Sequence, residues 1–238
     1  MQISIITATF NAANHLPQLI NSLQAQTTKN FEWVVADGGS TDTTLDILKS
    51  VKDLNIVLSS QADFGIYDAL NRAIKFSTSD YYVVIGADDV FEPDAIENFS
   101  NEIDGISAVI TSPILIKNKI YKLSPLPTFL SGFRAKLCGH SIASLFKKSL
   151  HDKYGYYSKK YPIAADYDFM MKLVVNKEKI KLCDFIVGRF GTEGVSMTDR
   201  IGSASEVMRI MISNDYSASV QVGIFVLRLL YTASSLKK

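Results

Sequence analysis

Short runs rich in β-branched and aromatic residues alternate with stretches of helical periodicity through the first hundred residues of this chain. Few folds suit that order: it is typical of a parallel sheet whose strands are joined by crossover helices. Apolar residues at i, i+3 and i+4 mark the helices between the runs. The predicted strands are 3–7, 32–36, 55–59 and 81–85, and the predicted helices carry the apolar residues of 16–23, 45–51 and 66–73. Ser40 and Thr41 are the predicted caps of the second helix.

The second half of the chain is of mixed type, because the strict alternation lapses after about residue 105. We predict strands over 108–116, 120–123, 142–146 and 180–187, a helix over 166–175, and two helices from about residue 203. The predicted fold class is therefore α/β, a mostly parallel, Rossmann-like sheet flanked by helices, with further helices at the C-terminus.

The composition excludes several classes of protein. Hydrophobic residues make up 47% and charged residues 21% of the 238 residues, and the formal net charge is +1. Neither a disordered chain nor a broad nucleic-acid-binding surface fits these values. Cys138 and Cys183 lack CxxC spacing, which argues against a disulfide framework and a thiolate zinc site. A reducing compartment is expected, and the partner must be recognised at a local site.

The two ends of the chain bear on its location. The first residues enter an apolar stretch without the basic and long apolar regions of a secretory signal, so we expect a cytoplasmic protein. The apolar segment 220–231 contains Gln221, Gly223 and Arg228 and is too short to span a bilayer. Two lysines end the chain. Two interpretations of this segment stay open: a helix on a membrane surface, or a last helix docked on the core.

Acidic residues follow two of the predicted strands, and the ligand crevice of an open parallel sheet lies beyond the carboxyl ends of its strands. The first acidic stretch runs from Asp37 to Asp42. Gly38 and Gly39 permit close approach of a ligand there, and Asp37 can accept hydrogen bonds from a base or a ribose. The alternative is an ordinary turn that leads into a helix cap.

Asp88 and Asp89 directly follow the apolar strand 81–85 and its Gly86-Ala87 extension. Adjacent carboxylates repel each other, and a bound divalent cation is one reason to keep both ionised. Mg²⁺ and Mn²⁺ use one or two carboxylates and complete their shell with substrate phosphates. The alternative is a capped turn into a helix that begins near Pro93.

Asp166 and Asp168 stand at the start of the predicted helix 166–175. Two residues along a helix correspond to a rotation of about 200°, so the two carboxylates point in different directions. One can cap the helix while the other faces the crevice as a general base. The alternative is that both acids serve as caps.

Several familiar motifs are missing. His140 and His151 lack HExxH spacing or a cysteine partner, and Ser141 and Ser144 are not in a GxSxG elbow. No GxxxxGK[ST] loop or GxGxxG fingerprint occurs. These features disfavour a zinc site, a nucleophilic triad, an ATPase and a dinucleotide-binding protein.

Five motifs occur in the order seen in family 2 glycosyltransferases, which the chain resembles over about residues 3–197. They are Thr7-Ala8-Thr9-Phe10-Asn11, Asp37-Gly38-Gly39-Ser40-Thr41-Asp42, the segment Asp63–Asn71, Ala87-Asp88-Asp89 and Ala165-Asp166-Tyr167-Asp168. The segment Asp63–Asn71 and the ending Gly194-Val195-Ser196 are similar to bacterial enzymes that build O-antigen, colanic acid or capsule repeat units. The resemblance implies a GT-A fold and inverting transfer of a sugar from a nucleoside diphosphate donor, with UDP the commonest nucleotide. The implied acceptor is a saccharide, and we expect it to be lipid-linked.

The resemblance also implies a donor site. Carried over by matching position, Phe10 and Asp37 would hold the nucleotide base. Gly65 and Asp68 would shape the donor pocket, and Asp88 would contact the ribose or the metal.

Three further roles follow from the same resemblance. Asp89 would ligate Mn²⁺ or Mg²⁺, Asp166 would be the general base, and His140 would lie on the acceptor side. The chain departs from the family pattern where Gly86 replaces an additional Asp, Ala165 replaces a Glu, Lys172 replaces an Arg and Ser141 replaces a Gln. The first three departures remove or alter groups that relatives place near the metal or the base.

We expect a catalytic domain over 1–202, with a nucleotide-binding half at 1–104 and an acceptor half at 105–202, and a helical extension over 203–238. Two other functions stay open: a nucleotidyltransferase, whose usual Gly-rich start with a following Lys is absent, and a noncatalytic sugar-binding component of a polysaccharide assembly complex. Intact Asp88, Asp89 and Asp166 favour an enzyme. A lipid-linked acceptor would place it at the inner face of the cytoplasmic membrane.

Overall fold

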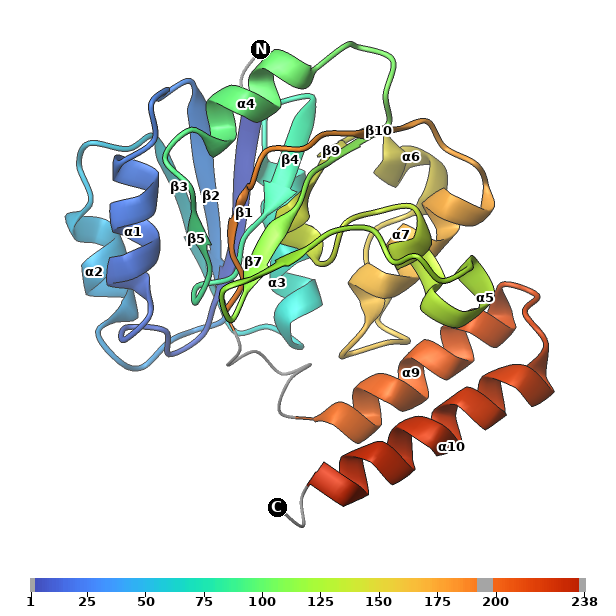
Figure 1. The fold of residues 1–238 in the computed structure, drawn as a ribbon. Helices are drawn as coiled ribbons and strands as arrows, with labels where there is room; N and C mark the ends of the chain where they lie inside the picture. Colours follow the sequence, from blue (N-terminus) through green and yellow to red (C-terminus); the bar gives the residue numbers. More distant parts are fainter. Residues whose placement is uncertain (1–2, 192–198, 236–238) are drawn as a thin grey trace.

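A seven-stranded sheet forms the centre of the protein, in the order β10-β6-β9-β4-β1-β2-β3 (Figure 1). The computed structural model describes residues 3–191 and 199–235, so the predicted motif at Gly194-Val195-Ser196 lies outside the described residues. The strands are β1 (Ile3–Thr9), β2 (Phe31–Asp37), β3 (Ile56–Ser60), β4 (Tyr81–Val84), β6 (Val109–Thr111), β9 (Ser144–Lys147) and β10 (Ile180–Leu182). Only β9 runs antiparallel to its two neighbours in this sheet. The predicted α/β class with a mostly parallel sheet is confirmed.

Helices cover both faces of the sheet. The helices α1 (Leu16–Gln24), α2 (Thr44–Ser50) and α4 (Ala95–Glu102) pack on one face, and α3 (Ile66–Phe76) and α7 (Ala165–Val175) pack on the other. Successive strand residues enter opposite cores: Ile5 joins the first core and Ile6 joins the second. Burial on both faces explains why β1, β2 and β4 are nearly continuous apolar runs.

A smaller sheet and several short helices complete the second half. The four short strands β5 (Val90–Phe91), β7 (Ile114–Ile116), β8 (Lys119–Tyr121) and β11 (Gly188–Arg189) pair in the order β5-β11-β7-β8. The short helices are α5 (Thr128–Ser131), η1 (Gly132–Ala135), η2 (Ser141–Ala143) and α6 (Leu150–Tyr154). β7 lies within the predicted strand 108–116 and β8 overlaps the predicted strand 120–123. The two-residue strands β5 and β11 were not predicted, because runs of that length carry no periodic signal.

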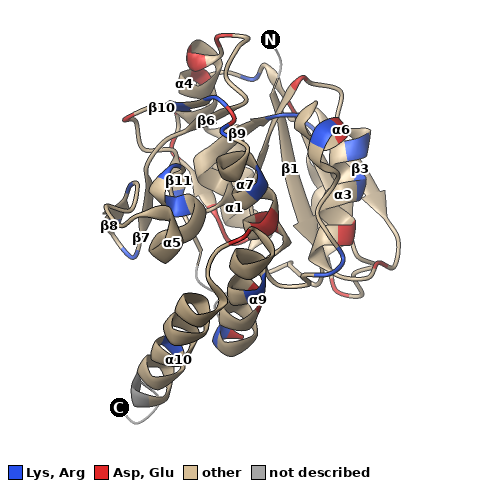
Figure 2. Cartoon of the chain, turned by 90° about the vertical axis from the view of Figure 1, so that its right-hand side faces the viewer, with Lys and Arg blue, Asp and Glu red and all other residues tan. Residues whose placement is uncertain are grey.

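The last two helices, α9 (Arg200–Ser213) and α10 (Ala218–Ser235), lie side by side next to the body of the protein (Figures 1 and 2). The two predicted C-terminal helices are therefore present, although α9 begins before residue 203. Among the described residues, no helix is long and apolar enough to cross a bilayer.

Three predicted strands are shorter than expected. The predicted strand 108–116 divides at Pro113, which has no N–H to offer a ladder, so β6 enters the large sheet and β7 the small one. In the predicted strand 142–146, residues Ser141–Ala143 form a turn of 3-10 helix and the strand begins at Ser144. In the predicted strand 180–187, pairing ends at Leu182.

The predicted helix caps were wrong in two places. Helix α2 begins at Thr44, whose N–H donates to Asp42 Oδ1 at 3.0 Å, while the Ser40 hydroxyl donates to Asp37. At α7, neither Asp166 nor Asp168 caps the helix. The Oε2 atom of Glu206 on α9 instead accepts hydrogen bonds from the N–H groups of residues 163 and 164, at 3.0 and 2.8 Å. At α2 the acceptor is thus a nearby aspartate that was not predicted, and at α7 a distant glutamate binds the two N–H groups just before the helix.

Strand order reverses beside β1, since β2 and β3 lie on one side of it and β4 on the other. The carboxyl ends of two parallel strands diverge at such a point and leave a crevice for ligands. The segments after β1, β2 and β4 all meet this edge, and each contains predicted site residues.

Candidate active site

A cavity of about 320 Å³ opens at the carboxyl end of β4, and it is lined by four of the predicted site residues, Asp88, Asp89, His140 and Asp166. These residues come from three separate stretches of the chain and meet only through the fold. The other four, Phe10, Asp37, Gly65 and Asp68, are not part of this wall; they lie at the ends of β1 and β2 and at the start of α3.

Asp89 is buried, with 3% of its surface exposed. Its Oδ2 accepts a hydrogen bond from the N–H of Gly86 at 2.8 Å, and its Oδ1 accepts one from the N–H of Gly191 at 2.7 Å. Burial raises the pKa of the carboxyl to about 7; the two N–H donors oppose this and the neighbouring Asp88 adds to it. The carboxyl is therefore held rigidly where negative charge is costly, and a cation would offset that cost.

Glycines close around the two carboxylates. A Cβ at Gly191 would lie 2.1 Å from Asp88 Oδ2, and a Cβ at Gly86 would lie 3.0 Å from Asp88 Oδ1 and 3.1 Å from Asp89 Oδ2. A side chain at residue 86 would therefore press on both carboxylates, and these would have to shift by a few tenths of an ångström to make room.

The Asp88–Asp89 pair supplies the hard oxygen ligands that Mg²⁺ and Mn²⁺ prefer. Within residues 3–191 and 199–235, no three His, Cys, Asp or Glu side chains gather as a metal site. The pair fits a cation that completes its shell with substrate phosphates.

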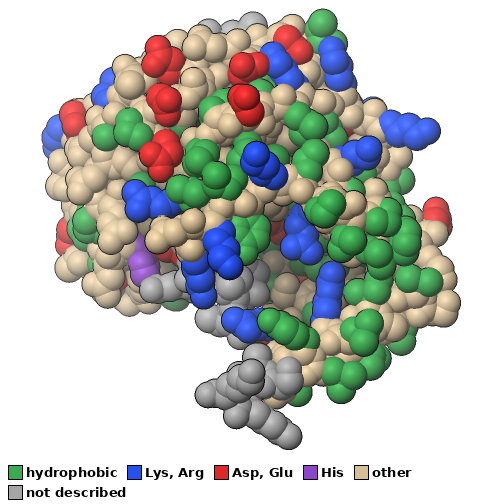
Figure 3. All heavy atoms as spheres, in the orientation of Figure 1, with side chains coloured by type: hydrophobic (Ala, Val, Ile, Leu, Met, Phe, Trp, Pro, Cys, Tyr) green, Lys and Arg blue, Asp and Glu red, His purple; other side chains and the backbone are tan. Residues whose placement is uncertain are grey.

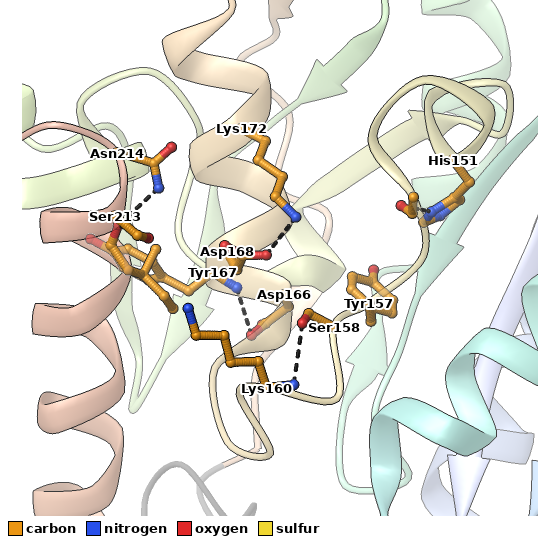
Figure 4. Close-up of polar contacts among 12 residues, drawn as sticks. His151, Tyr157, Ser158, Lys160, Asp166, Tyr167, Asp168, Lys172, Ser213 and Asn214 are labelled. Atoms are coloured by element: carbon orange, nitrogen blue, oxygen red, sulfur yellow. Dashed lines mark hydrogen bonds and ion pairs between the residues drawn. The ribbon is translucent and has the colours of Figure 1, made fainter.

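Asp166 stands in the first turn of α7 and faces the cavity. Its Oδ1 accepts a hydrogen bond from the Tyr67 hydroxyl at 2.7 Å. The same atom accepts one from the N–H of Tyr167 at 2.8 Å (Figure 4). No described residue donates a hydrogen bond to its Oδ2. Burial raises the pKa of this carboxyl above its ordinary value, although the two hydrogen bonds oppose the shift. A fixed carboxylate with one unused oxygen and a raised pKa has the properties of a general base.

Asp168 has a different environment from Asp166. It is a buried residue of α7, and its carboxylate forms an ion pair at 2.7 Å with Lys172, one turn further along the helix (Figure 4). It does not line the cavity. The two acids therefore separate as the 200° rotation predicts.

Two residues with no predicted role help to position Asp166, namely Tyr67 and Glu206. The Tyr67 hydroxyl lies within hydrogen-bond distance of both Asp166 and the carbonyl oxygen of Ile163, and Glu206 holds the backbone just before α7. Tyr67 stands within one of the quoted motifs, but it is 99 residues from Asp166. Glu206 has no local signal at all.

The Asp37 carboxylate already accepts five hydrogen bonds. Its Oδ1 accepts from the Thr9 and Ser40 hydroxyls, and its Oδ2 accepts from the N–H groups of Gly39 and Ser40, both at 2.9 Å, and from the Ser60 hydroxyl. Burial opposes ionisation, but these donors outweigh it and hold the pKa below its usual range. Asp37 thus ties the ends of β1, β2 and β3 together, and a contact with the nucleotide base stays a prediction.

We expect Asp37→Asn to lower the free energy of unfolding by about 1–3 kcal/mol, because an amide turns a donor toward groups that need an acceptor. The folded pKa lies below the unfolded value, so this contribution is present above about pH 4 and is lost as the pH falls through the folded pKa. Denaturant melts between pH 3 and 7 measure it. Asp46→Asn, at an exposed acid on α2, is the control; equal stability losses in both variants would refute the network.

The remaining predicted residues are consistent with a ligand edge. Gly65 precedes α3 with φ of +108°, a backbone conformation that side chains disfavour. Asp68 lies 3.6 Å from the Lys159 ammonium, and the Phe10 ring is 65% exposed beyond β1. The His140 ring stacks on Phe190 with centroids 3.8 Å apart, and burial, aided by the charge of Arg134, lowers its pKa to about 4. His140 is therefore neutral near pH 7.

The comparisons with known proteins agree with this arrangement. The family model "Glycosyl transferase family 2" matches residues 4–164. A "PGL/p-HBAD biosynthesis glycosyltransferase" of Mycobacterium bovis (strain BCG / Pasteur 1173P2) is 30% identical over 183 residues, which is 73% of this chain and 70% of the relative.

Solved structures confirm the predicted GT-A fold. S. aureus TarS 1-349 in complex with UDP-GlcNAc superposes with a TM-score of 0.71 at 22% identity, covering 96% of this chain and 72% of that one. The mannosyltransferase PcManGT from Pyrobaculum calidifontis, in complex with GDP-Man and Mn²⁺, also gives 0.71, at 16% identity, over 98% of this chain and 75% of that one. The family model spans more than half of the residues of this chain, and residues of the motifs that resemble the family line the cavity. This chain therefore belongs to glycosyl transferase family 2.

Proposed function

We propose that the protein moves a hexosyl group from a nucleoside diphosphate sugar, with UDP the expected nucleotide, to a saccharide acceptor with inversion at the anomeric carbon. The observation that carries this proposal is that Asp88, Asp89 and Asp166 line one cavity at the edge of the sheet where nucleotides bind in such folds. The similarity to proteins solved with UDP-GlcNAc and with GDP-Man and Mn²⁺ supports a nucleotide-sugar donor.

The chemistry divides between the two groups of acids. Asp89, with Asp88, would hold Mn²⁺ or Mg²⁺, which when bound supplies positive charge against the diphosphate leaving group. Asp166 accepts the proton of the acceptor hydroxyl through its unused Oδ2 while Tyr67 fixes its Oδ1. A base on the face opposite the leaving group leads to inversion in a single displacement. Phe10 and the loop that Asp37 holds together form the donor side of the same edge.

A donor screen tests the proposal. UDP-, GDP- and dTDP-sugars are incubated with the full chain, Mn²⁺ and a lipid-linked saccharide, and release of the nucleoside diphosphate is measured. We expect release of one diphosphate with the acceptor present and slow donor hydrolysis without it. Pyrophosphate-dependent formation of a nucleoside triphosphate would identify a nucleotidyltransferase instead. Donor binding without any cleavage would identify a sugar-binding component.

The acceptor side contains an outward apolar surface on α10. We name this surface the α10 outer face, and its exposed members are Val220, Val222, Val226, Leu227, Leu230 and Tyr231. The opposite side of α10 packs inward, and the buried Gln221 Nε2 donates to the carbonyl oxygen of Phe129 at 2.8 Å. A helix usually turns its apolar side to the core, so this reversed face supports our proposal of peripheral contact with the inner surface of the cytoplasmic membrane.

We expect the double variant Val226→Glu, Leu230→Glu to lose binding to liposomes in a flotation assay, because both residues belong to the α10 outer face. Circular dichroism and nucleotide binding should stay unchanged, since neither side chain packs in a core cluster. The control is Ile106→Glu, at an exposed apolar residue 69% accessible on another part of the surface. Equal flotation of all three proteins would contradict membrane contact through α10.

A further inference from the structure

The cavity that contains Asp166 is also lined by two arginines, Arg134 and Arg228, for which no role was predicted. Arg134 stands on η1, and Arg228 is the only charged residue of α10. The bond from Gln221 to Phe129 ties the start of α10 to α5, directly before η1, so the two arginines are brought together from stretches far apart in the chain. Figure 3 shows Lys and Arg side chains around the hollow beside the two C-terminal helices.

Neither guanidinium has a carboxylate partner among the described residues. Burial lowers the pKa of Arg228; the nearby Tyr167 opposes this and the charge of Arg134 adds to it. The two like charges on one cavity wall repel each other, and an anionic ligand bound between them would relieve that repulsion.

The arginines lie on the Asp166 side of the cavity. Phe133, next to Arg134, packs edge-on against Tyr167 with ring centroids 4.9 Å apart, and the charges of both arginines act on the Tyr167 hydroxyl. Tyr167 directly follows Asp166, the proposed base. Arg228 also lines the groove between α9 and α10 together with Leu227 and Tyr231, which belong to the α10 outer face. The arginine pair therefore lies next to the apolar groove between α9 and α10, on the side of the cavity that contains Asp166.

We infer that Arg134 and Arg228 bind a phosphate group on the acceptor, whose apolar chain lies along the groove between α9 and α10. Guanidinium groups suit this role because their planar N–H donors match phosphate oxygens in pairs. The inference rests on the proposed transfer reaction and specifies that its saccharide acceptor is linked through phosphate to a lipid.

The test measures binding of three probes to the full chain by calorimetry in the presence of UDP and Mn²⁺: farnesyl phosphate, farnesol and inorganic phosphate. We expect farnesyl phosphate to bind at least tenfold more tightly than either other probe. Arg134→Gln and Arg228→Gln should each weaken its binding tenfold or more, while Arg228→Lys should retain part of it. Arg209→Gln, at an exposed arginine of α9 outside the cavity, is the matched control.

Three results would overturn the inference. Equal binding of inorganic and farnesyl phosphate would indicate a free-anion site, and unchanged binding in both glutamine variants of folded protein would remove the arginines from the site. Loss of UDP affinity with farnesyl phosphate binding intact would place them on the donor. Failure of the wild-type chain to bind any nucleotide would instead contradict the proposed function, and farnesyl phosphate binding measured without nucleotide would still test the arginines.

Discussion

Asp166→Asn should reduce sugar transfer by about 10²-fold or more while nucleotide binding survives. The amide keeps the shape of the side chain and its bond from Tyr67 but cannot accept a proton. Because burial raises the pKa of Asp166, the acid limb of the wild-type rate profile should lie at a higher pH than that of an ordinary carboxyl, about 4. The rate should fall as the pH drops through that raised pKa, and the limb should be absent in the variant.

Asp168→Asn is the matched control, since it makes the same change two residues further along the same helix. It weakens the ion pair with Lys172 and should cost about 1–2 kcal/mol of stability with transfer largely retained. Near-normal transfer by Asp166→Asn, together with loss of transfer by a folded, donor-binding Asp168→Asn variant, would reverse the assignment.

Asp89→Ala should abolish cation-dependent transfer. The variant removes the buried carboxylate proposed to hold the cation, so no bound cation would offset the charge of the leaving diphosphate, at a cost of several kcal/mol. A second effect is independent of turnover: Mn²⁺ should strengthen UDP binding to the wild-type chain but not to the variant. Calorimetric titrations of UDP with and without Mn²⁺ measure this difference.

The control for Asp89→Ala is Asp94→Ala, at an exposed acid before α4 that does not line the cavity. It should behave as the wild type in both assays. Full transfer by Asp89→Ala in excess EDTA would contradict a metal role for this residue.

Much of the sheet could be predicted because β1, β2 and β4 are buried on both faces, and burial of that kind leaves a continuous apolar run in the sequence. Asp88 and Asp89 follow such a run directly, so their place at the sheet edge followed from the strand. The division of 108–116 depends on one proline. In the second sheet, β7 and β8 form a local hairpin, and β11 joins this hairpin to β5 from far along the chain.

The supports of the site were harder to predict than its acids. Tyr67 on α3 and Arg228 on α10 line the cavity, and Glu206 on α9 holds the backbone just before α7. No spacing or motif links any of the three to Asp166. Tertiary contacts of this kind leave no periodic trace in a sequence, which is why the segment of α10 could be interpreted equally as a membrane helix or a docked helix.

We propose that the nucleoside diphosphate leaves in a single displacement within the cavity lined by Asp89 and Asp166. Nuclear magnetic resonance can follow this reaction directly. The full chain is incubated with Mn²⁺ and an α-linked nucleoside diphosphate sugar selected in the donor screen. The anomeric proton of the first-formed product and the phosphorus signals are followed together. We expect a β-linked or β-anomeric sugar and a free nucleoside diphosphate. An α-configured product, or a sugar 1-phosphate with the nucleotide cleaved between its phosphates, would contradict it.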